Sequence, residues 1–180
     1  MAIVISAYPA CGKSTLYREF AKSANDPFSL KILDSDSSRF SWIYDANGNK
    51  TDERNPKFPE NYIRHIQKHL KDADVIFVSS HEIVREALSK ADIPFISIYP
   101  KDTIVNMKEW ERRFLNRGNT QSFIQFQMEH WSEFIDALEK DKRPFKKIRL
   151  DVFTDPVITP ELVFDLIDRY DSETGDFWNE

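Results

Sequence analysis

A short loop near the N-terminus has the residue types and spacing of a phosphate-binding site. Gly12-Lys13-Ser14-Thr15 closes the loop, which follows an apolar, β-branched run and precedes a helical pattern. In such a loop the backbone N–H groups surround phosphates, the lysine reaches the β- and γ-phosphates, and the serine hydroxyl coordinates Mg²⁺. The pattern therefore predicts that ATP and Mg²⁺ bind here. The predicted ATP-binding residues are Tyr8, Pro9, Ala10, Cys11, Gly12, Lys13, Ser14 and Thr15.

Two carboxylates follow the second predicted strand. Asp34 and Asp36 are spaced i, i+2, so in an extended chain they project to the same side. Ligands of open α/β sheets bind at the carboxyl ends of the strands. We therefore predict that Asp34 holds Mg²⁺ together with Ser14, and that Asp36 accepts a proton from, or orients, the attacking acceptor. The alternative is a solvated turn in which the acidic pair caps the following segment.

Five arginines are candidates for binding phosphate, and one of them, Arg54, lies in the long polar insert. Arg113 and Arg117 lie four apart on one face of a predicted helix, where they are expected either to close over the transferring phosphates or to form a solvated basic face. Arg39 and Arg85 are expected to bind a phosphate of the acceptor, because a guanidinium pairs with phosphate oxygens through two hydrogen bonds. The predicted catalytic residues are Lys13, Asp36, Arg113 and Arg117, and the predicted substrate-binding residues are Asp36, Arg39 and Arg85.

Strand-like and helical segments alternate along the chain, which is typical of a parallel sheet with crossover helices. Strands are predicted near 2–6, 31–34, 75–79, 94–99 and 146–150. Helices are predicted near 13–22, 59–72, 81–91, 103–117, 120–140 and 160–170. The helix-boundary signals are a capping box over 79–82, Gly118 as a stop, Thr120 as a cap, and Thr159-Pro160 as the start of the last helix.

Three segments stand apart from this alternation. Residues 37–59 are polar, contain the turn signal Asn47-Gly48, and are expected to form an irregular insert on the acceptor side. Residues 103–140 are expected to act as a helical lid, and the acidic tail 171–180 is expected to fray. Aromatic residues around the insert are expected either to join the core or to stack on a base; they are Phe40, Trp42, Tyr44, Phe58 and Tyr62.

Composition narrows the class of protein. A hydrophobic content of 41% and a charged content of 31% indicate one globular domain over residues 1–180. No apolar run is long enough to span a membrane and no signal peptide is recognised, so a cytoplasmic location is expected. The net charge of −5 favours a small-molecule partner over nucleic acid. Cys11 is the single cysteine; it either fills the loop or has a pKa lowered by Lys13.

The chain resembles the nucleoside-monophosphate-kinase-like group of P-loop kinases, in which a phosphate loop, a strand-end Asp-x-Asp and lid arginines occur in this order. The pair Asp34-Ser-Asp36 is similar to that of shikimate and gluconate kinases, where one acid serves Mg²⁺ and the other the acceptor hydroxyl. Residues 33–42 and 58–62 are similar to small phage-encoded P-loop proteins described as nucleotide or adenylate kinases. The chain departs from adenylate kinase at Ala7, where a glycine is usual, and in lacking the Asp-Gly-Phe-Pro-Arg stretch.

The patterns and the resemblance together predict an α/β, three-layer P-loop fold with a parallel five-stranded sheet, helices on both faces and a small helical lid. The resemblance implies phosphoryl transfer from ATP, with Mg²⁺, to a small nucleotide, foremost a (deoxy)nucleoside monophosphate. The alternatives are a kinase of a hydroxymethylated base in DNA, a kinase of a small alcohol metabolite, and a non-catalytic ATP-binding regulator. Base specificity and oligomeric state stay open.

Overall fold

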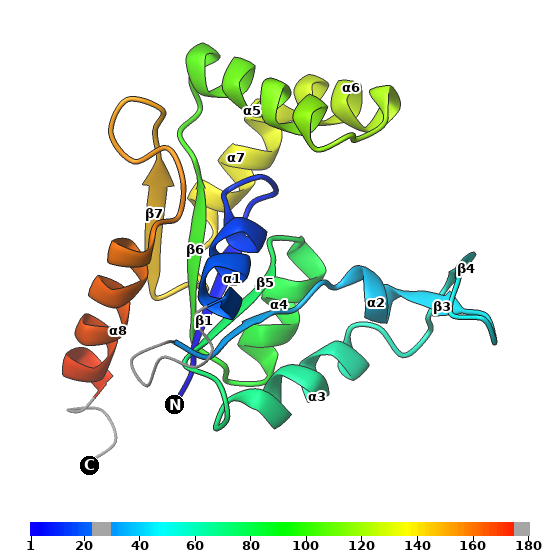
Figure 1. Ribbon diagram of the computed structural model, residues 1–180, viewed down its shortest axis with the longest axis vertical. Coiled ribbons are helices and arrows are strands. Elements are labelled where there is room, and N and C mark those ends of the chain that lie inside the picture. The colour runs from blue at the N-terminus through cyan, green and yellow to red at the C-terminus, as the bar shows by residue number, and fades with distance from the viewer. Residues whose placement is uncertain (23–29, 175–180) are drawn as a thin grey trace.

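A computed structural model describes residues 1–22 and 30–174, and its centre is a five-stranded parallel sheet (Figure 1). The strands run in the order β2-β5-β1-β6-β7, and each predicted strand is present. Because β1 is central and buried along its whole length, its apolar residues are needed on both faces of the sheet. The strands are β1 (Ile3–Ala7), β2 (Ile32–Asp34), β5 (Val75–Ser79), β6 (Phe95–Pro100) and β7 (Lys146–Leu150).

Helices connect the strands, and two of their bounds differ from prediction. The segment predicted as one helix over 120–140 is two helices, because His130 leaves the helical conformation and joins them. The last helix continues to Thr174, so the first residues of the predicted tail are helical, whereas 175–180 lie outside the described residues. The helices are α1 (Lys13–Lys22), α2 (Ser38–Ser41), α3 (Glu60–His69), α4 (Glu82–Lys90), α5 (Ile104–Asn116), α6 (Gln121–Glu129), α7 (Trp131–Lys140) and α8 (Pro160–Thr174).

Helices cover both faces of the sheet, and the alternation of side chains along β1 assigns them. Val4 packs in one cluster with buried residues of α3 and α4, such as Ile66 and Leu88. Ile5, one residue further, packs in the other cluster with α1 and α8, and α5 and α7 add large aromatic side chains such as Trp110 to that cluster. The predicted helical lid is thus partly built into the core. Within the described residues no helix is long and apolar enough to cross a membrane.

The predicted irregular insert is instead folded. After the short helix α2, strands β3 (Trp42–Tyr44) and β4 (Lys50–Arg54) pair antiparallel and form a hairpin that projects from the body (Figure 1). The turn signal is confirmed: Gly48 has a φ of +80° and its N–H donates to the Asp45 carbonyl over 3.0 Å. The sequence hid these strands because β4 is polar and β3 is only three residues long, and a projecting ribbon has no core face that demands an apolar alternation.

Helix caps follow the sequence signals at most ends. Thr120 accepts a hydrogen bond from the Phe123 N–H, and the Gly118 φ of +73° ends the preceding helical segment. Thr159 accepts from the Leu162 N–H at the start of α8. The capping box predicted over 79–82 is wrong, because His81 occupies the N-cap position and makes no side-chain capping bond. An imidazole lacks the short oxygen-bearing side chain that reaches back to a helix N–H.

Candidate active site at the carboxyl ends of the strands

The phosphate loop between β1 and α1 is curled by two residues with positive φ. Ala10 has a φ of +63° and Gly12 a φ of +103°, and α1 begins with the Leu16 N–H donating to the Gly12 carbonyl over 3.0 Å. Left-handed residues of this kind turn successive N–H groups toward one concave side, which is a site for anions. The start of α1 adds the positive end of a helix dipole. The loop therefore has the backbone shape that a phosphate chain requires.

Gly12 is required here for a second reason, which is close packing. A Cβ at this position would lie 3.3 Å from the Val157 Cβ, and the left-handed φ already disfavours a side chain. The Ile158 N–H donates to the Cys11 carbonyl over 2.9 Å, so the segment before α8 is joined to the phosphate loop. Burial raises the pKa of the Cys11 thiol to about 12, although Lys13 and nearby arginines oppose this rise. Of the two alternatives for Cys11, the lowered pKa is therefore wrong, and the buried side chain fills the loop.

Lys13 lies within the loop. Its Nζ donates to the Ala7 carbonyl over 2.6 Å and lies 3.5 Å from the Tyr8 carbonyl. Burial lowers the Lys13 pKa, which the negative charges of Asp34 and Asp36 partly offset, whereas the charge of Arg117 adds to the lowering. The cationic group predicted to neutralise phosphate is thus surrounded by the predicted metal ligand, the predicted base and a predicted lid arginine.

The predicted Mg²⁺ ligands meet. The Ser14 hydroxyl, in the first turn of α1, donates to Asp34 Oδ2 over 2.9 Å at the end of β2. Hydroxyl and carboxylate oxygens are hard donors, and Mg²⁺ binds by one or two of them plus water and phosphate oxygens. In residues 1–22 and 30–174 no cluster of three or more His, Cys, Asp or Glu side chains is placed to hold a metal ion. The donor set therefore fits Mg²⁺ held partly by a nucleotide rather than an all-protein cage.

Asp36 is exposed and is engaged locally. Its Oδ1 accepts from the Ser38 N–H over 2.9 Å and its Oδ2 accepts from the Ser38 hydroxyl over 2.7 Å. This is the capping turn that the sequence left as the alternative for the acidic pair. The position also suits chemistry, since the charge of Asp36 raises the pKa of both Lys13 and His81 and therefore lies near them.

Arg113 is directed toward the phosphate loop. Its guanidinium lies 4.1 Å above the Trp110 ring, donates to Glu109 over 2.9 Å, and reaches the Ala10 carbonyl over 3.3 Å. The Trp110 indole N–H donates to the Pro9 carbonyl over 2.9 Å. Helix α5 therefore contacts two successive backbone carbonyls of the loop, and it ends beside Arg117. Trp110 is a site contact that sequence reasoning missed, because a tryptophan at helical spacing is typical of a core residue.

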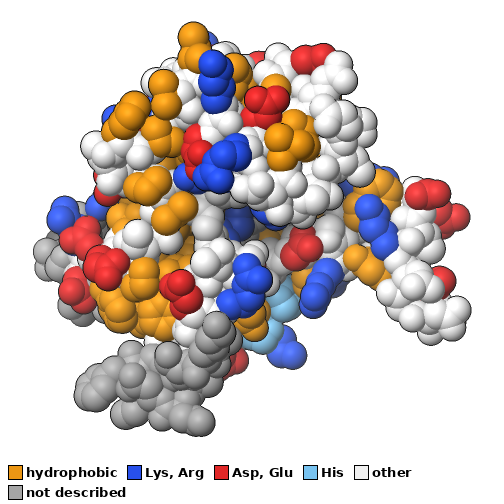
Figure 2. Space-filling model, turned by 45° about the horizontal axis from the view of Figure 1, so that its top comes forward, with side chains coloured by type: hydrophobic (Ala, Val, Ile, Leu, Met, Phe, Trp, Pro, Cys, Tyr) orange, Lys and Arg blue, Asp and Glu red, His pale blue; other side chains and the backbone are white. Residues whose placement is uncertain are grey.

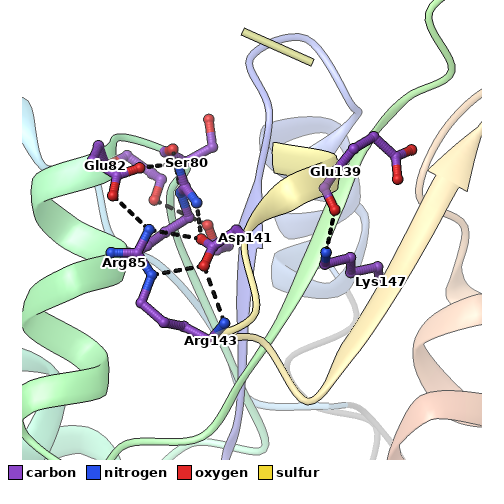
Figure 3. Close-up of polar contacts among 9 residues, drawn as sticks. Ser80, Glu82, Arg85, Glu139, Asp141, Arg143 and Lys147 are labelled. Atoms are coloured by element: carbon purple, nitrogen blue, oxygen red, sulfur yellow. Dashed lines mark hydrogen bonds and ion pairs between the residues drawn. The ribbon is translucent and has the colours of Figure 1, made fainter. Parts of the chain in front are cut away.

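Arg85 is paired within a polar cluster of its own (Figure 3). It is buried, and its Nε donates to the Ser80 carbonyl over 3.0 Å while its terminal nitrogens pair with Glu82, at 2.6 Å, and with Asp141. Arg143 completes the cluster by pairing with Asp141 over 2.7 Å. Each donor nitrogen of Arg85 has a partner, so Arg85 joins α4 to the segment before β7. Its partner Asp141 lies 56 residues further along the chain, so no local sequence pattern indicates this pairing.

Two further residues border the site. Arg39 is exposed on α2, on the insert side of the acidic pair. His81 follows β5, and its Nδ1 lies 3.1 Å from the Ser79 hydroxyl. Burial lowers the His81 pKa, and the positive charges of Lys13 and Arg54 lower it further. The charged form of His81, at the edge of the sheet where β5 ends, is therefore disfavoured.

Comparison with known proteins identifies the fold. No protein-family model matches the chain, and no curated protein matches it significantly. The crystal structure of a gluconokinase from Sinorhizobium meliloti 1021 aligns with a TM-score of 0.50 and 14% identity, over 99% of this chain and 97% of that chain. The crystal structure of APE1195 aligns with a TM-score of 0.39 and 16% identity, over 97% of this chain and 96% of that chain. The chain therefore shares the α/β fold of that gluconokinase structure.

Proposed function

We propose that the protein is a phosphotransferase that moves the γ-phosphoryl group of ATP, in the presence of Mg²⁺, to a small nucleotide acceptor. The observation that carries this proposal is the Ser14–Asp34 hydrogen bond of 2.9 Å beside the phosphate loop that holds Lys13. A hard-oxygen pair next to a curled, lysine-containing loop suits a nucleoside triphosphate with its metal ion. We infer that the preferred acceptor is a (deoxy)nucleoside monophosphate.

The donor side would be held by the loop. The N–H groups of residues 10–14 would bind the β- and γ-phosphates, and Lys13 would leave its backbone carbonyl partners to bind the oxygens between them. Ser14 and Asp34 would hold Mg²⁺. The metal ion supplies neutralisation of the phosphate oxygens as charge moves onto the leaving group. Little covalent chemistry is needed, so positioning of two anionic substrates accounts for most of the catalysis.

The acceptor side would be served by Asp36 and the arginines. An acceptor oxygen attacks the γ-phosphorus, the bond from phosphorus to the bridging oxygen breaks, and ADP leaves. For a hydroxyl acceptor the displaced proton passes to the Asp36 carboxylate. Arg113 and Arg117 would stabilise the charge that develops on the transferring group, and Arg39 would bind the acceptor. Arg85, predicted to bind substrate, would contribute only by joining α4 to the segment before β7, because its guanidinium is already paired with Glu82 and Asp141.

A second candidate is a kinase of a hydroxyl group, on a hydroxymethylated base in DNA or on a small alcohol. The position of a second carboxylate two residues beyond the Mg²⁺ acid favours it, since a phosphate acceptor needs no base whereas a hydroxyl does. Both candidates use the same donor site and differ only in what approaches Asp36.

One assay separates these functions. Purified protein is incubated with γ-labelled ATP and Mg²⁺ and offered four deoxynucleoside monophosphates, hydroxymethylated DNA and small alcohols in parallel. Label on a monophosphate supports the proposal, and label on DNA or an alcohol supports the second candidate. ATP binding without any labelled acceptor would instead indicate a regulator. Lys13→Ala should abolish every transfer, whereas Lys90→Ala, at the far end of α4, should not.

A further inference from the structure

The hairpin carries two cations that converge on one aromatic ring. The Lys50 Nζ lies 4.1 Å from the centroid of the Trp42 ring, and the Arg54 guanidinium carbon lies 3.7 Å from it. Trp42 and Arg54 face each other across the two strands, so the ribbon itself sets their contact. A ring that attracts cations by its quadrupole holds two long side chains in place without neutralising them. We call Trp42, Lys50 and Arg54 the arm cluster.

Strand β4 carries the two cations of the arm cluster, with the carboxylates of Asp52 and Glu53 between them along the chain. Within the described part of the chain neither Lys50 nor Arg54 forms an ion pair with a carboxylate, unlike the paired arginines. Arginines that do form such ion pairs include Arg85, Arg113, Arg143 and Arg149. Two like charges held close to one ring repel each other, so their placement costs free energy that an arriving anion would recover. Guanidinium and ammonium groups both bind phosphate, and the guanidinium does so through two hydrogen bonds.

One cation of the arm cluster lies close enough to the candidate active site for its charge to act there. The charge of Arg54 contributes to the lowered His81 pKa, as does that of Lys13, so Arg54 and Lys13 act on His81 together. Figure 2 shows Lys and Arg side chains around the hollow of this face and at the base of the projecting hairpin. A ligand that reaches Lys13 and extends toward the hairpin would therefore meet two further cations, Arg54 and Lys50.

The hairpin is built to hold its shape although it buries little. At its base the Asn61 side-chain amide donates to the Phe40 carbonyl over 2.9 Å, and Phe40 packs on Tyr62 with ring centroids 5.1 Å apart. At its tip Asp45 accepts from the N–H groups of Asn47 and Asn49 over 2.9 and 2.8 Å. A two-stranded ribbon is marginal in water without such bonds. The ribbon therefore presents its cations at a fixed distance from the body.

We propose that Lys50 and Arg54, held over Trp42, form a phosphate-binding subsite for the acceptor, separate from the phosphate loop. The ligand is a nucleotide phosphate that does not itself react, and it comes either from a free nucleotide or from a strand of nucleic acid. This inference rests on the proposed function for the direction in which the acceptor approaches. It assigns to the hairpin a role in holding the acceptor, which leaves the donor site unchanged.

The test measures binding and needs no turnover. Lys50→Gln and Arg54→Gln keep an aliphatic stem and a neutral polar end. The two single variants and the double variant are compared with wild type and with Lys90→Gln, a control at an exposed lysine of α4. Calorimetry measures the affinity for each deoxynucleoside monophosphate and for ATP. Fluorescence anisotropy measures the affinity for a labelled mixed-sequence DNA decanucleotide at several salt concentrations. Unphosphorylated deoxynucleosides serve as ligands that lack the group in question.

We expect each single variant to weaken binding of a phosphate-bearing probe about tenfold, as for loss of one charge-assisted hydrogen bond. If the probe is the monophosphate, the free nucleotide is the source. If only the decanucleotide is affected, with a salt slope lower by about 0.7 for each phosphate that is no longer neutralised, the source is a strand. Unchanged affinity of the double variant for both probes, or wild type that binds neither, overturns the subsite. ATP affinity reports on the proposed function separately and should be the same in all arm variants.

Discussion

The Ser14 hydroxyl donates to Asp34 Oδ2 over 2.9 Å, which joins the first turn of α1 to the end of β2. All strands of a parallel sheet end at the same edge, so α1, which follows β1, begins at the edge where β2 ends, with β5 between the two strands. The bond fixes the relative position of a hydroxyl and a carboxylate before any ligand arrives. Both oxygens are then available to one metal ion.

Asp34→Asn tests this pair. The amide keeps the size of the side chain but removes its charge, so the Mg²⁺ concentration at half-maximal transfer should rise about tenfold or more. Titration of activity with Mg²⁺ at fixed ATP measures the change. Asp52→Asn, an exposed acid on the hairpin strand β4, is the matched control and should leave the Mg²⁺ dependence as in wild type. An unaltered titration for Asp34→Asn would remove this residue from the metal site.

Asp36 and Ser38 can be separated by their different predicted losses. Asp36→Asn should lower kcat for a hydroxyl acceptor about a hundredfold while ATP binding is kept, because the proton acceptor is lost. Ser38→Ala removes only the 2.7 Å hydrogen bond from the serine hydroxyl to Asp36, so it should lower the free energy of unfolding by about 1 kcal/mol at most and spare kcat. Steady-state kinetics and denaturant unfolding provide both values. Equal kinetic effects of the two variants would mean that Asp36 acts only as a cap.

Glu109 predicts a pH dependence of stability. Hydrogen bonds from Arg112 first, and then from Arg113, lower the Glu109 pKa to about 2. Because the folded pKa lies below the unfolded value, the carboxylate stabilises the fold above the unfolded pKa and this contribution is lost as pH falls toward 2. The difference in free energy of unfolding between wild type and Glu109→Gln should be largest near pH 6 and shrink below about pH 4.5. Urea titrations over this range measure it, and a constant difference would contradict the pairing.

Cys11 predicts a silent thiol. Burial raises its pKa to about 12, so at pH 8 it is protonated and out of reach of reagents. Ellman's reagent should react slowly with the folded protein and at once in denaturant, to one equivalent because Cys11 is the single cysteine. Fast reaction of the native protein would show that the phosphate loop opens readily.

The sequence was most informative where a residue's local neighbours decide its structure. The β-branched run before Gly12 and the caps at Thr120 and Thr159 all act within a few residues, and each was predicted correctly. The break at His130 was not visible, since apolar periodicity continues across it into α7. A helix ends where tertiary packing redirects the chain, which a local pattern does not record.

Partnerships across the chain were the least predictable part of the site. Arg85 carries the same charge as Arg113, and both follow a predicted strand, yet one is buried against Asp141 and the other lies on the phosphate loop. The hairpin escaped prediction because β3 is only three residues long and β4 is polar, although its turn was recognised. Local patterns therefore located the candidate active site, whereas the choice among its arginines needed coordinates.

The phosphate loop is tied to the rest of the molecule from two sides. Trp110 and Arg113 hold the Pro9 and Ala10 carbonyls, and the Ile158 N–H holds the Cys11 carbonyl from the opposite direction. A loop braced in this way has little conformational entropy left to lose when a ligand arrives. Contacts with a nucleotide then contribute to its binding free energy with little entropic cost of ordering the loop. Substitutions in α5 that do not touch a phosphate should still weaken nucleotide binding, because they make the loop more mobile.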